Sequence, residues 1–170
     1  MHKIFILLVL STLLGSAQSQ AQVPPHTITG ITPMSHVARG TFEVSVKPLP
    51  FEEAGDGVKI GRMSIDKKIS GDLTATTKGQ MLTAGTDTKG SAGYVAIEYV
   101  TGTLSGHEGT FILQHTATMN RGEPSMSITV VPDSGAGELK GLVGDFRINI
   151  VDGKHFYEFT YRLDGRSGDD

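Results

Sequence analysis

The sequence predicts an all-β fold, a closed antiparallel barrel of about eight strands. Glycine is abundant, with 22 of 170 residues, while aromatic residues make up 6% and tryptophan is absent. This composition is typical of a turn-rich β protein. Apolar and polar residues alternate along most of the chain, and a glycine pattern occurs twice. Short connections in up-and-down order favour a barrel because closure removes exposed sheet edges. A β-sandwich is the alternative.

The N-terminus has the pattern of an export signal. Lys3 precedes an apolar run at residues 4–14, and Ser-Gln-Ala at residues 19–21 fits a small-x-small cleavage site. The run is short for a membrane span, so a signal peptide at residues 1–21 is favoured over an uncleaved anchor. We therefore expect a secreted or periplasmic protein with no stable membrane insertion after cleavage. The chain has no cysteine, so its stability must come from packing.

The rest of the chain is predicted to form one domain. Residues 22–38 contain three prolines without periodicity and are expected to be a flexible leader. The barrel domain is predicted at 39–164, and residues 165–170 are expected to be a disordered tail. Fifteen basic residues against 18 acidic ones give a net charge of −3. This balance argues against a nucleic-acid partner, which needs clustered positive charge.

The strands are predicted from the period-two alternation. Phe42, Val44 and Val46 share one face of the first strand, which Pro48 and Pro50 are expected to end. Residues 52–57 are expected to be a loop. Further strands are predicted at 60–69, 72–78, 94–103, 110–119, 126–131, 146–151 and 155–163, the last two forming a closing hairpin.

The repeated pattern is G-x-L-x-G-x-x-G-x-F, at residues 102–111 and again at 137–146, with a degraded copy beginning at Gly71. Each copy joins two strand-like stretches, so two equivalent corners of the sheet are expected. The leucine or the phenylalanine of each copy can point into the core, and the glycines let backbones approach closely. A phosphate-binding loop is disfavoured because the spacing is not G-x-G-x-x-G and no helix follows.

Three segments carry a family resemblance: residues 90–98 (GSAGYVAIE), 111–115 (FILQH) and 130–135 (VVPDSG). They resemble the signature blocks of an uncharacterised bacterial domain-of-unknown-function family, whose implied fold is an allene oxide cyclase-like β-barrel. The glycine unit is more loosely similar to the glycine-rich turn of plant allene oxide cyclases and dirigent proteins. The resemblance covers roughly residues 40–163. It implies a fold and brings no assigned catalytic residues.

Glu98 and His115 are the candidate catalytic residues. Glu98 lies mid-strand among apolar neighbours, and facing inward it would be a carboxylate able to act as acid or base in a low-dielectric lumen. The alternative places Glu98 on the outside and its apolar neighbours in the core. His115 shares a face with Phe111 and Leu113, where it can serve as a proton shuttle or as a hydrogen-bonded core residue.

Four further residues are candidate ligand contacts. Tyr94 lies on the same face as Glu98 and can offer a phenol to a ligand oxygen. Gln114 is adjacent to the candidate histidine, so only one of the two is expected to line the lumen. Tyr157 and Tyr161 alternate on the last strand, where they form a ligand wall or simply part of the core.

No cofactor or metal is expected. Asp152 and His155 near a turn would supply only two ligands. The chain has neither a G-x-S-x-G elbow nor a cysteine nucleophile. We therefore predict an exported barrel that binds a small apolar ligand without catalysis. The alternatives are an isomerase or cyclase that acts in the barrel lumen, and a structural envelope protein with a packed barrel. The oligomeric state is left open.

Overall fold

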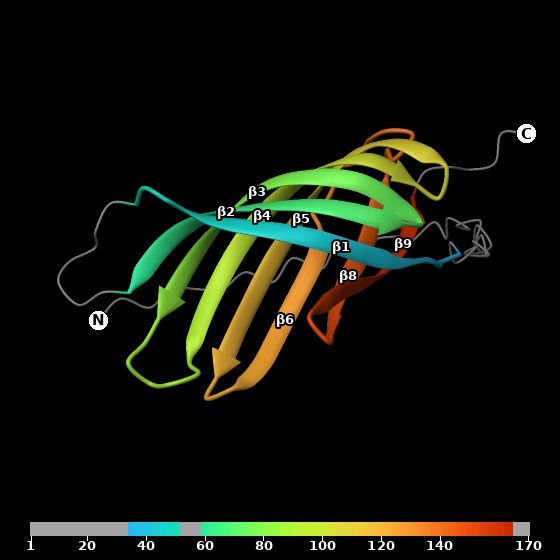
Figure 1. The fold of residues 1–170 in the computed structure, drawn as a ribbon. Coiled ribbons are helices and arrows are strands. Elements are labelled where there is room, and N and C mark those ends of the chain that lie inside the picture. Colours follow the sequence, from blue (N-terminus) through green and yellow to red (C-terminus); the bar gives the residue numbers. More distant parts are fainter. Residues whose placement is uncertain (1–33, 52–58, 165–170) are drawn as a thin grey trace, which may run out of the picture. The chain divides into compact units, whose positions relative to one another are not determined.

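The computed structural model of the chain describes residues 34–51 and 59–164, which form a single antiparallel β-barrel (Figure 1). Eight strands close in the order β1-β2-β3-β4-β5-β6-β8-β9, with β9 pairing back to β1, and a short ninth strand, β7, pairs with β5. This confirms the predicted all-β closed barrel. Within the described part no helix is long and apolar enough to cross a membrane. The strands are β1 (His36–Leu49), β2 (Ile60–Gly71), β3 (Leu73–Gly85), β4 (Ala92–Leu104), β5 (His107–Asn120), β6 (Glu123–Val130), β7 (Ala136–Gly137), β8 (Leu142–Val151) and β9 (Lys154–Leu163).

Several strand boundaries differ from the prediction. β1 begins at His36 and buries Ala38 completely, so the predicted leader extends three residues too far. β1 also continues through Pro48, which pairs with Met63 of β2. Proline is tolerated there because β9 pairs with β1 only as far as Phe42, which leaves the other side of Pro48 without a ladder. The predicted signal peptide, the leader up to residue 33, the loop at 52–57 and the tail at 165–170 lie outside the described residues.

The third strand is longer than its sequence pattern indicates. The prediction ends it at residue 78, whereas β3 continues to Gly85. Every residue of β3 pairs with β4, from Leu73 opposite Leu104 to Gly85 opposite Ala92. Pairing with a long neighbour therefore extends the strand through Lys78-Gly79-Gln80, where local sequence favours an end.

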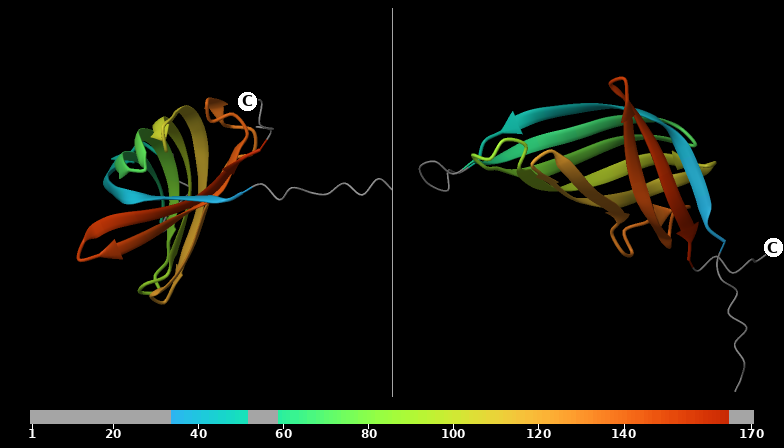
Figure 2. Two further views of the ribbon diagram at one scale, coloured as in Figure 1. Left: turned by 90° about the vertical axis from the view of Figure 1, so that its right-hand side faces the viewer. Right: turned by 90° about the horizontal axis from the view of Figure 1, so that it is seen from below.

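The barrel wall is complete over only part of its length. β9 pairs with β1 only from His36 to Phe42, and β8 meets β6 at a single pair, Thr129 opposite Asp145. Beyond these pairs β1–β6 continue as a curved sheet without β8 and β9 across from them, as Figures 1 and 2 show. We call the part that includes β8 and β9 the closed half and the part beyond it the open half.

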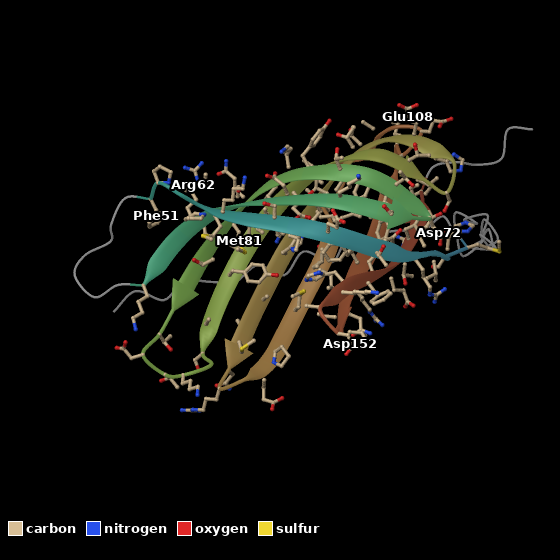
Figure 3. The ribbon with its side chains drawn as sticks, viewed as in Figure 1. Phe51, Arg62, Asp72, Met81, Glu108 and Asp152 are labelled. Carbon is tan, nitrogen blue, oxygen red and sulfur yellow. The ribbon has the colours of Figure 1, made fainter. Side chains whose placement is uncertain are left out.

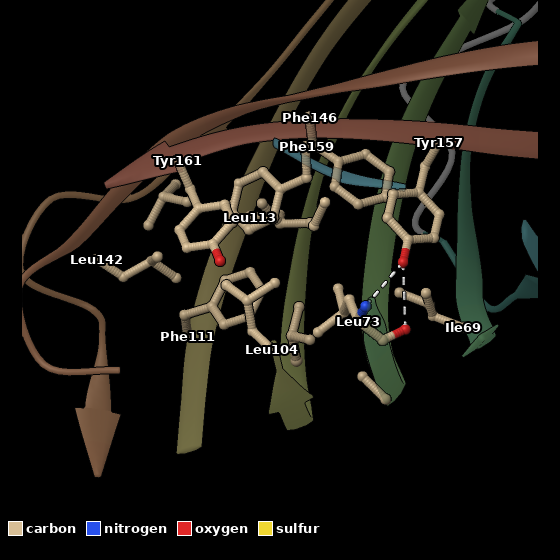
Figure 4. Close-up of a cluster of buried hydrophobic side chains, with 14 of the residues drawn as sticks. Ile69, Leu73, Leu104, Phe111, Leu113, Leu142, Phe146, Tyr157, Phe159 and Tyr161 are labelled. Carbon is tan, nitrogen blue, oxygen red and sulfur yellow. Dashed lines mark hydrogen bonds between the residues drawn. The ribbon is translucent and has the colours of Figure 1, made fainter. Parts of the chain in front are cut away.

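The closed half holds the hydrophobic core (Figure 4). Phe111 stacks on Phe159 with ring centroids 5.8 Å apart, and Phe146 stacks on Tyr157 at 5.1 Å. Aromatic pairs of this kind stabilise a core beyond their buried area. The buried cluster consists of Ala38, Phe42, Ile69, Leu73, Ala75, Val100, Leu104, Phe111, Leu113, Ile128, Val130, Leu139, Leu142, Phe146, Tyr157, Phe159 and Tyr161.

The copies of the glycine pattern meet at the far end of the closed half. Their leucines, Leu73, Leu104 and Leu139, are all fully buried, as predicted. The two complete copies are also direct neighbours, because Gly109 of the first pairs with Gly137 of the second. The first copy forms the β4–β5 hairpin, whereas the second spans β7, a turn and the start of β8. The expectation of two equivalent corners is therefore wrong, since the two complete copies pair with each other. We call this joined segment, residues 102–111 and 137–146, the plug.

Glycine is required in this plug because the backbones approach closely. A Cβ atom on Gly102 would lie 2.2 Å from the carbonyl oxygen of Thr74. Such a contact is far inside van der Waals distance, so a side chain would push β3 and β4 apart. By contrast, a Cβ on Gly93, in the same strand, would make ordinary contacts at 3.5 Å or more.

We predict that Gly102→Ala destabilises the barrel by about 1–3 kcal/mol, the usual effect of forcing extra atoms into a packed region. Gly93→Ala is the matched control in β4 and is expected to change the free energy of unfolding by less than about 1 kcal/mol. Urea denaturation followed by circular dichroism measures both. Equal effects of the two substitutions would contradict the steric role of Gly102.

Candidate functional site

Three ionisable side chains lie inside the barrel where the closed half meets the open half. They are Lys67 of β2, Glu98 of β4 and His115 of β5, with relative exposures of 5%, 0% and 1%. In each strand the residues two positions away on either side also face inward, as strand alternation requires. Glu98 therefore faces inward, and the alternative in which it lies on the outer face is excluded.

The three side chains converge on one carboxylate oxygen. Lys67 Nζ donates a hydrogen bond to Glu98 Oε2 at 2.8 Å. His115 Nε2 lies 3.4 Å from the same oxygen, which is longer than a typical N–H···O bond. The Lys67 ammonium also lies 5.2 Å from the centre of the Phe42 ring, within the range of a cation–π interaction. The result is a buried, charge-balanced pair with a histidine beside it.

Gly79 makes the Lys67–Glu98 contact sterically accessible. The two residues are on β2 and β4, and β3 lies between these strands. Gly79 is the residue of β3 directly opposite Glu98, and a Cβ there would lie 2.7 Å from Glu98 Cγ. The missing side chain leaves the space in which Glu98 extends across β3 toward Lys67. Thr77 supports the other end by accepting a hydrogen bond from the backbone N–H of Lys67 at 2.9 Å.

Burial and neighbouring charges shift the pKa values of Glu98, Lys67 and Tyr94. Burial works to raise the pKa of Glu98, but the adjacent His115 ring and Lys67 ammonium outweigh it, so the pKa lies below its usual range. Burial lowers the pKa of Lys67, and the negative charge of Glu98 partly opposes that effect. Burial raises the pKa of Tyr94, and the Glu98 charge adds to the increase. Glu98 is therefore ionised near neutral pH, while Tyr94 keeps its proton.

Part of the cluster's hydrogen-bonding capacity is unused within the described chain. Glu98 Oε1 and both ring nitrogens of His115 are buried, and none makes a hydrogen bond to a described residue. Buried polar atoms normally have partners, because an unsatisfied one costs about 1–3 kcal/mol. These atoms make the cluster the candidate position for a further polar contact. Among the described residues no group of three His, Asp or Glu side chains is arranged to hold a metal ion.

The inner face of the open half is apolar and rich in methionine. Four of the six methionines of the chain lie on inward positions of β2, β3, β5 and β6; Met119 and Met126 are about half exposed, and Met63 and Met81 are partly buried. Figure 3 places Met81 toward this half and Asp72 and Glu108 toward the opposite end. Val46 of β1 belongs to an inward row of this half, and Ile150 of β8 belongs to an inward row of the closed half, yet both are exposed. Their exposure follows from the missing strand pairs opposite them.

A hollow lies on the outer face of β2–β5. It has a volume of about 1040 Å³. Its apolar floor consists of the half-exposed outward residues Leu82, Val95, Ile97 and Tyr99. Four polar residues of its rim are paired, because Arg62 donates to Gln80 Oε1 and Lys78 forms an ion pair with Asp66 at 3.3 Å.

The predicted site residues fall into three places: the buried cluster, the outer hollow and the core of the closed half. Glu98 and His115 come together in the buried cluster, and Tyr94 faces the same interior with its hydroxyl 4.0 Å from the sulfur of Met126. Gln114 points outward and lines the outer hollow. The sequence allowed only one of Gln114 and His115 to face the lumen, and that residue is His115.

The two tyrosines of β9 lie in the core of the closed half. Tyr157 accepts a hydrogen bond from the backbone N–H of Leu73 at 2.9 Å (Figure 4). The Tyr161 hydroxyl bonds to Ser105 Oγ at 3.0 Å. Both phenols are thus engaged in fastening β9 to the opposite wall, in line with the alternative that this aromatic face belongs to the core.

Lys67 and the inward-facing methionines of the open half were not predicted from the sequence. Lys67 carries a local signal, because it lies between Ile65 and Ile69 on the apolar face of an alternating strand. A lysine at such a position is rarely buried without a partner. The partner, Glu98, lies 31 residues away on a strand that is not adjacent, so the signal could not identify the pair.

Comparisons with known proteins agree with the fold. The sequence profile of the family described as "Protein of unknown function (DUF3224)" matches residues 38–161. The chain is also similar to the crystal structure of a protein of unknown function from the same family in Shewanella oneidensis MR-1. The two share 45% identity and a TM-score of 0.73, over 77% of this chain and 99% of the other. Comparison with curated proteins gives no match. The predicted resemblance to an uncharacterised bacterial family is confirmed.

We predict that Glu98→Gln destabilises the barrel by about 3–5 kcal/mol, because it leaves the Lys67 ammonium buried without its counter-charge. Replacing both charges with apolar side chains of similar size, in Lys67→Met/Glu98→Leu, is expected to leave the free energy of unfolding unchanged or higher. Denaturant titration compares the two variants. A double variant as unstable as the single one would show that the ion pair itself stabilises the fold.

The lowered pKa of Glu98 also predicts a pH dependence. The unfolded chain binds a proton on this carboxyl at higher pH than the folded chain does, so the stabilisation is complete above the ordinary glutamate pKa of about 4.3. It is lost as the pH falls through the folded-state pKa. The difference in free energy of unfolding between wild type and Glu98→Gln should therefore become smaller as the pH is lowered from 7 to 3. Glu158→Gln, at the exposed ion pair with Arg39, is the control and should show a small gap throughout.

Proposed function

The chain belongs to the DUF3224 family, and we propose that it binds a small, largely apolar molecule on the inner face of the open half. One observation carries the proposal. Side chains that face inward, and that alternation would bury in a complete barrel, are instead half exposed, as Met119 and Met126 are. Exposed apolar surface gathered on one concave face is characteristic of a site for an apolar partner.

The composition of this face favours an adaptable ligand site. Met63 and Met81 are directly opposite each other on β2 and β3, and Met126 is opposite Ala117 of β5. Methionine side chains are unbranched and polarisable, so they fit ligands of irregular shape. The floor of the site is the buried cluster of Lys67 and its partners, which supplies the few polar contacts that orient a bound molecule.

The outer hollow is the competing location for the ligand, and its side chains favour ligand binding less strongly than those of the inner face. Four of its polar residues already pair with one another, in the Arg62–Gln80 hydrogen bond and the Lys78–Asp66 ion pair. The inner site has unpartnered polar atoms on Glu98 and His115 at the end of its apolar wall. A ligand inside therefore gains both apolar burial and hydrogen bonds, whereas one outside gains mainly apolar burial.

Catalysis at the same site is the second candidate, as an isomerase or cyclase. It is favoured by the approach of His115 Nε2 to the Glu98 carboxylate, which pairs an ionised acceptor with a residue able to carry a proton. Such an enzyme would act largely by holding one conformer of its substrate. Turnover of a bound compound that Glu98→Gln abolishes while binding persists would distinguish an enzyme from a carrier.

In either role we propose that the protein acts after export, on the basis of the signal pattern in residues 1–21.

We predict that a neutral apolar fluorophore, N-phenyl-1-naphthylamine, binds the protein and that Met126→Glu weakens this binding at least tenfold. The new carboxylate would have to be desolvated against the apolar probe. Ile97→Glu is the matched control, since Met126 and Ile97 are 50% and 49% exposed but face opposite sides of the sheet. It should change the dissociation constant by less than twofold. Fluorescence titration measures both, with circular dichroism to verify folding.

The reverse pattern, in which Ile97→Glu alone weakens binding, would move the site to the outer hollow and contradict the proposal. Absence of probe binding by the wild type would favour the third alternative, a structural protein that acts through its surface.

A further inference from the structure

We infer that the ligand of the open half carries a neutral hydroxyl group and that this group donates a hydrogen bond to Glu98 Oε1. The inference rests on the proposed function, because it assigns the chemistry of the molecule bound there. It starts from the atoms of Glu98 and His115 that are buried without a hydrogen-bond partner in the described chain.

The direction of the missing hydrogen bond follows from the state of the carboxylate. Lys67 Nζ binds Oε2 at 2.8 Å, and this ion pair keeps Glu98 ionised. An ionised carboxylate only accepts hydrogen bonds, so the partner of Oε1 must be a donor. An ester, ether or ketone oxygen cannot fill this position, whereas a hydroxyl or an amine can.

The charge balance of the cluster then selects between these donors. Lys67 and Glu98 cancel each other's charge. A ligand ammonium would bring an unbalanced positive charge into a buried site, and a ligand carboxylate would bring a second negative charge next to Glu98. A hydroxyl brings neither. It can also accept a hydrogen bond while donating one, so it is able to engage a ring nitrogen of His115 as well.

This position lies at the buried end of the inward rows of β4 and β5. On β5 the inward residues become steadily less exposed from Met119 through Ala117 to His115, at 44%, 7% and 1%. These three positions span about 13 Å of strand. On β4 the inward row likewise leads from the half-buried Tyr94 to the fully buried Glu98. A molecule with an apolar body and one hydroxyl end matches an inner face that is apolar where it is exposed and polar where it is buried.

The test compares three ligands of equal chain length as competitors of bound N-phenyl-1-naphthylamine: 1-decanol, decanoate and methyl decanoate, each below the concentration at which it aggregates. We expect 1-decanol to displace the probe at a concentration at least tenfold lower than either of the others. In Lys67→Met/Glu98→Leu, chosen because it should keep the fold, this preference should fall below about twofold. Glu123→Gln at the exposed start of β6 is the control and should retain the preference.

Each other outcome has a distinct meaning. Equal displacement by all three compounds, or stronger displacement by decanoate, overturns the hydroxyl assignment and leaves the proposed apolar site standing. A preference for 1-decanol that persists in the double variant also overturns the assignment, because the selecting group is then not Glu98. If the probe does not bind the wild type, the proposed function fails and the inference fails with it.

Discussion

The unequal length of the strand pairings is the constraint on which the rest of this molecule depends. β1–β6 run past the last pairs that β8 and β9 make, and the barrel closes between β6 and β8 through a single pair, Thr129 opposite Asp145. The closed half can therefore pack side chains from all sides, and it holds the aromatic and leucine core. The open half leaves inward residues such as Met126 half exposed. A packed scaffold and an accessible inner face thus follow from one feature of the topology.

The buried ion pair lies at the boundary between the closed half and the open half. Removing two charges from water is costly, and the contact between Lys67 and Glu98 compensates only because its geometry is close. The contact depends on Gly79, whose missing side chain lets Glu98 extend across β3. Apolar residues of similar size would maintain the fold as well. The charges next to a histidine with unpartnered nitrogens therefore support the binding site proposed above.

Local patterns in the sequence predicted much of the fold and part of the site. Alternation on the strand of His115 correctly grouped it with Phe111 and Leu113, which all face inward and are buried. The buried leucines of the glycine pattern were also predicted. Lys67 was not, because its meaning depends on Glu98, a residue two strands away in the sheet. The continuation of β3 to Gly85 was missed for a similar reason, since its pairing with β4 outweighs a locally weak strand sequence.

The sequence by itself determined the all-β class, the strand faces and the family, because these depend on period-two alternation and on short blocks of neighbouring residues. Only the tertiary structure decided where the barrel is open, which polar residues meet inside it, and that the glycine repeats form one plug. These features arise from pairings between distant strands, such as β1 with β9 and β5 with β7. The register and extent of such pairings are set by the whole closed sheet, so no local stretch of sequence specifies them.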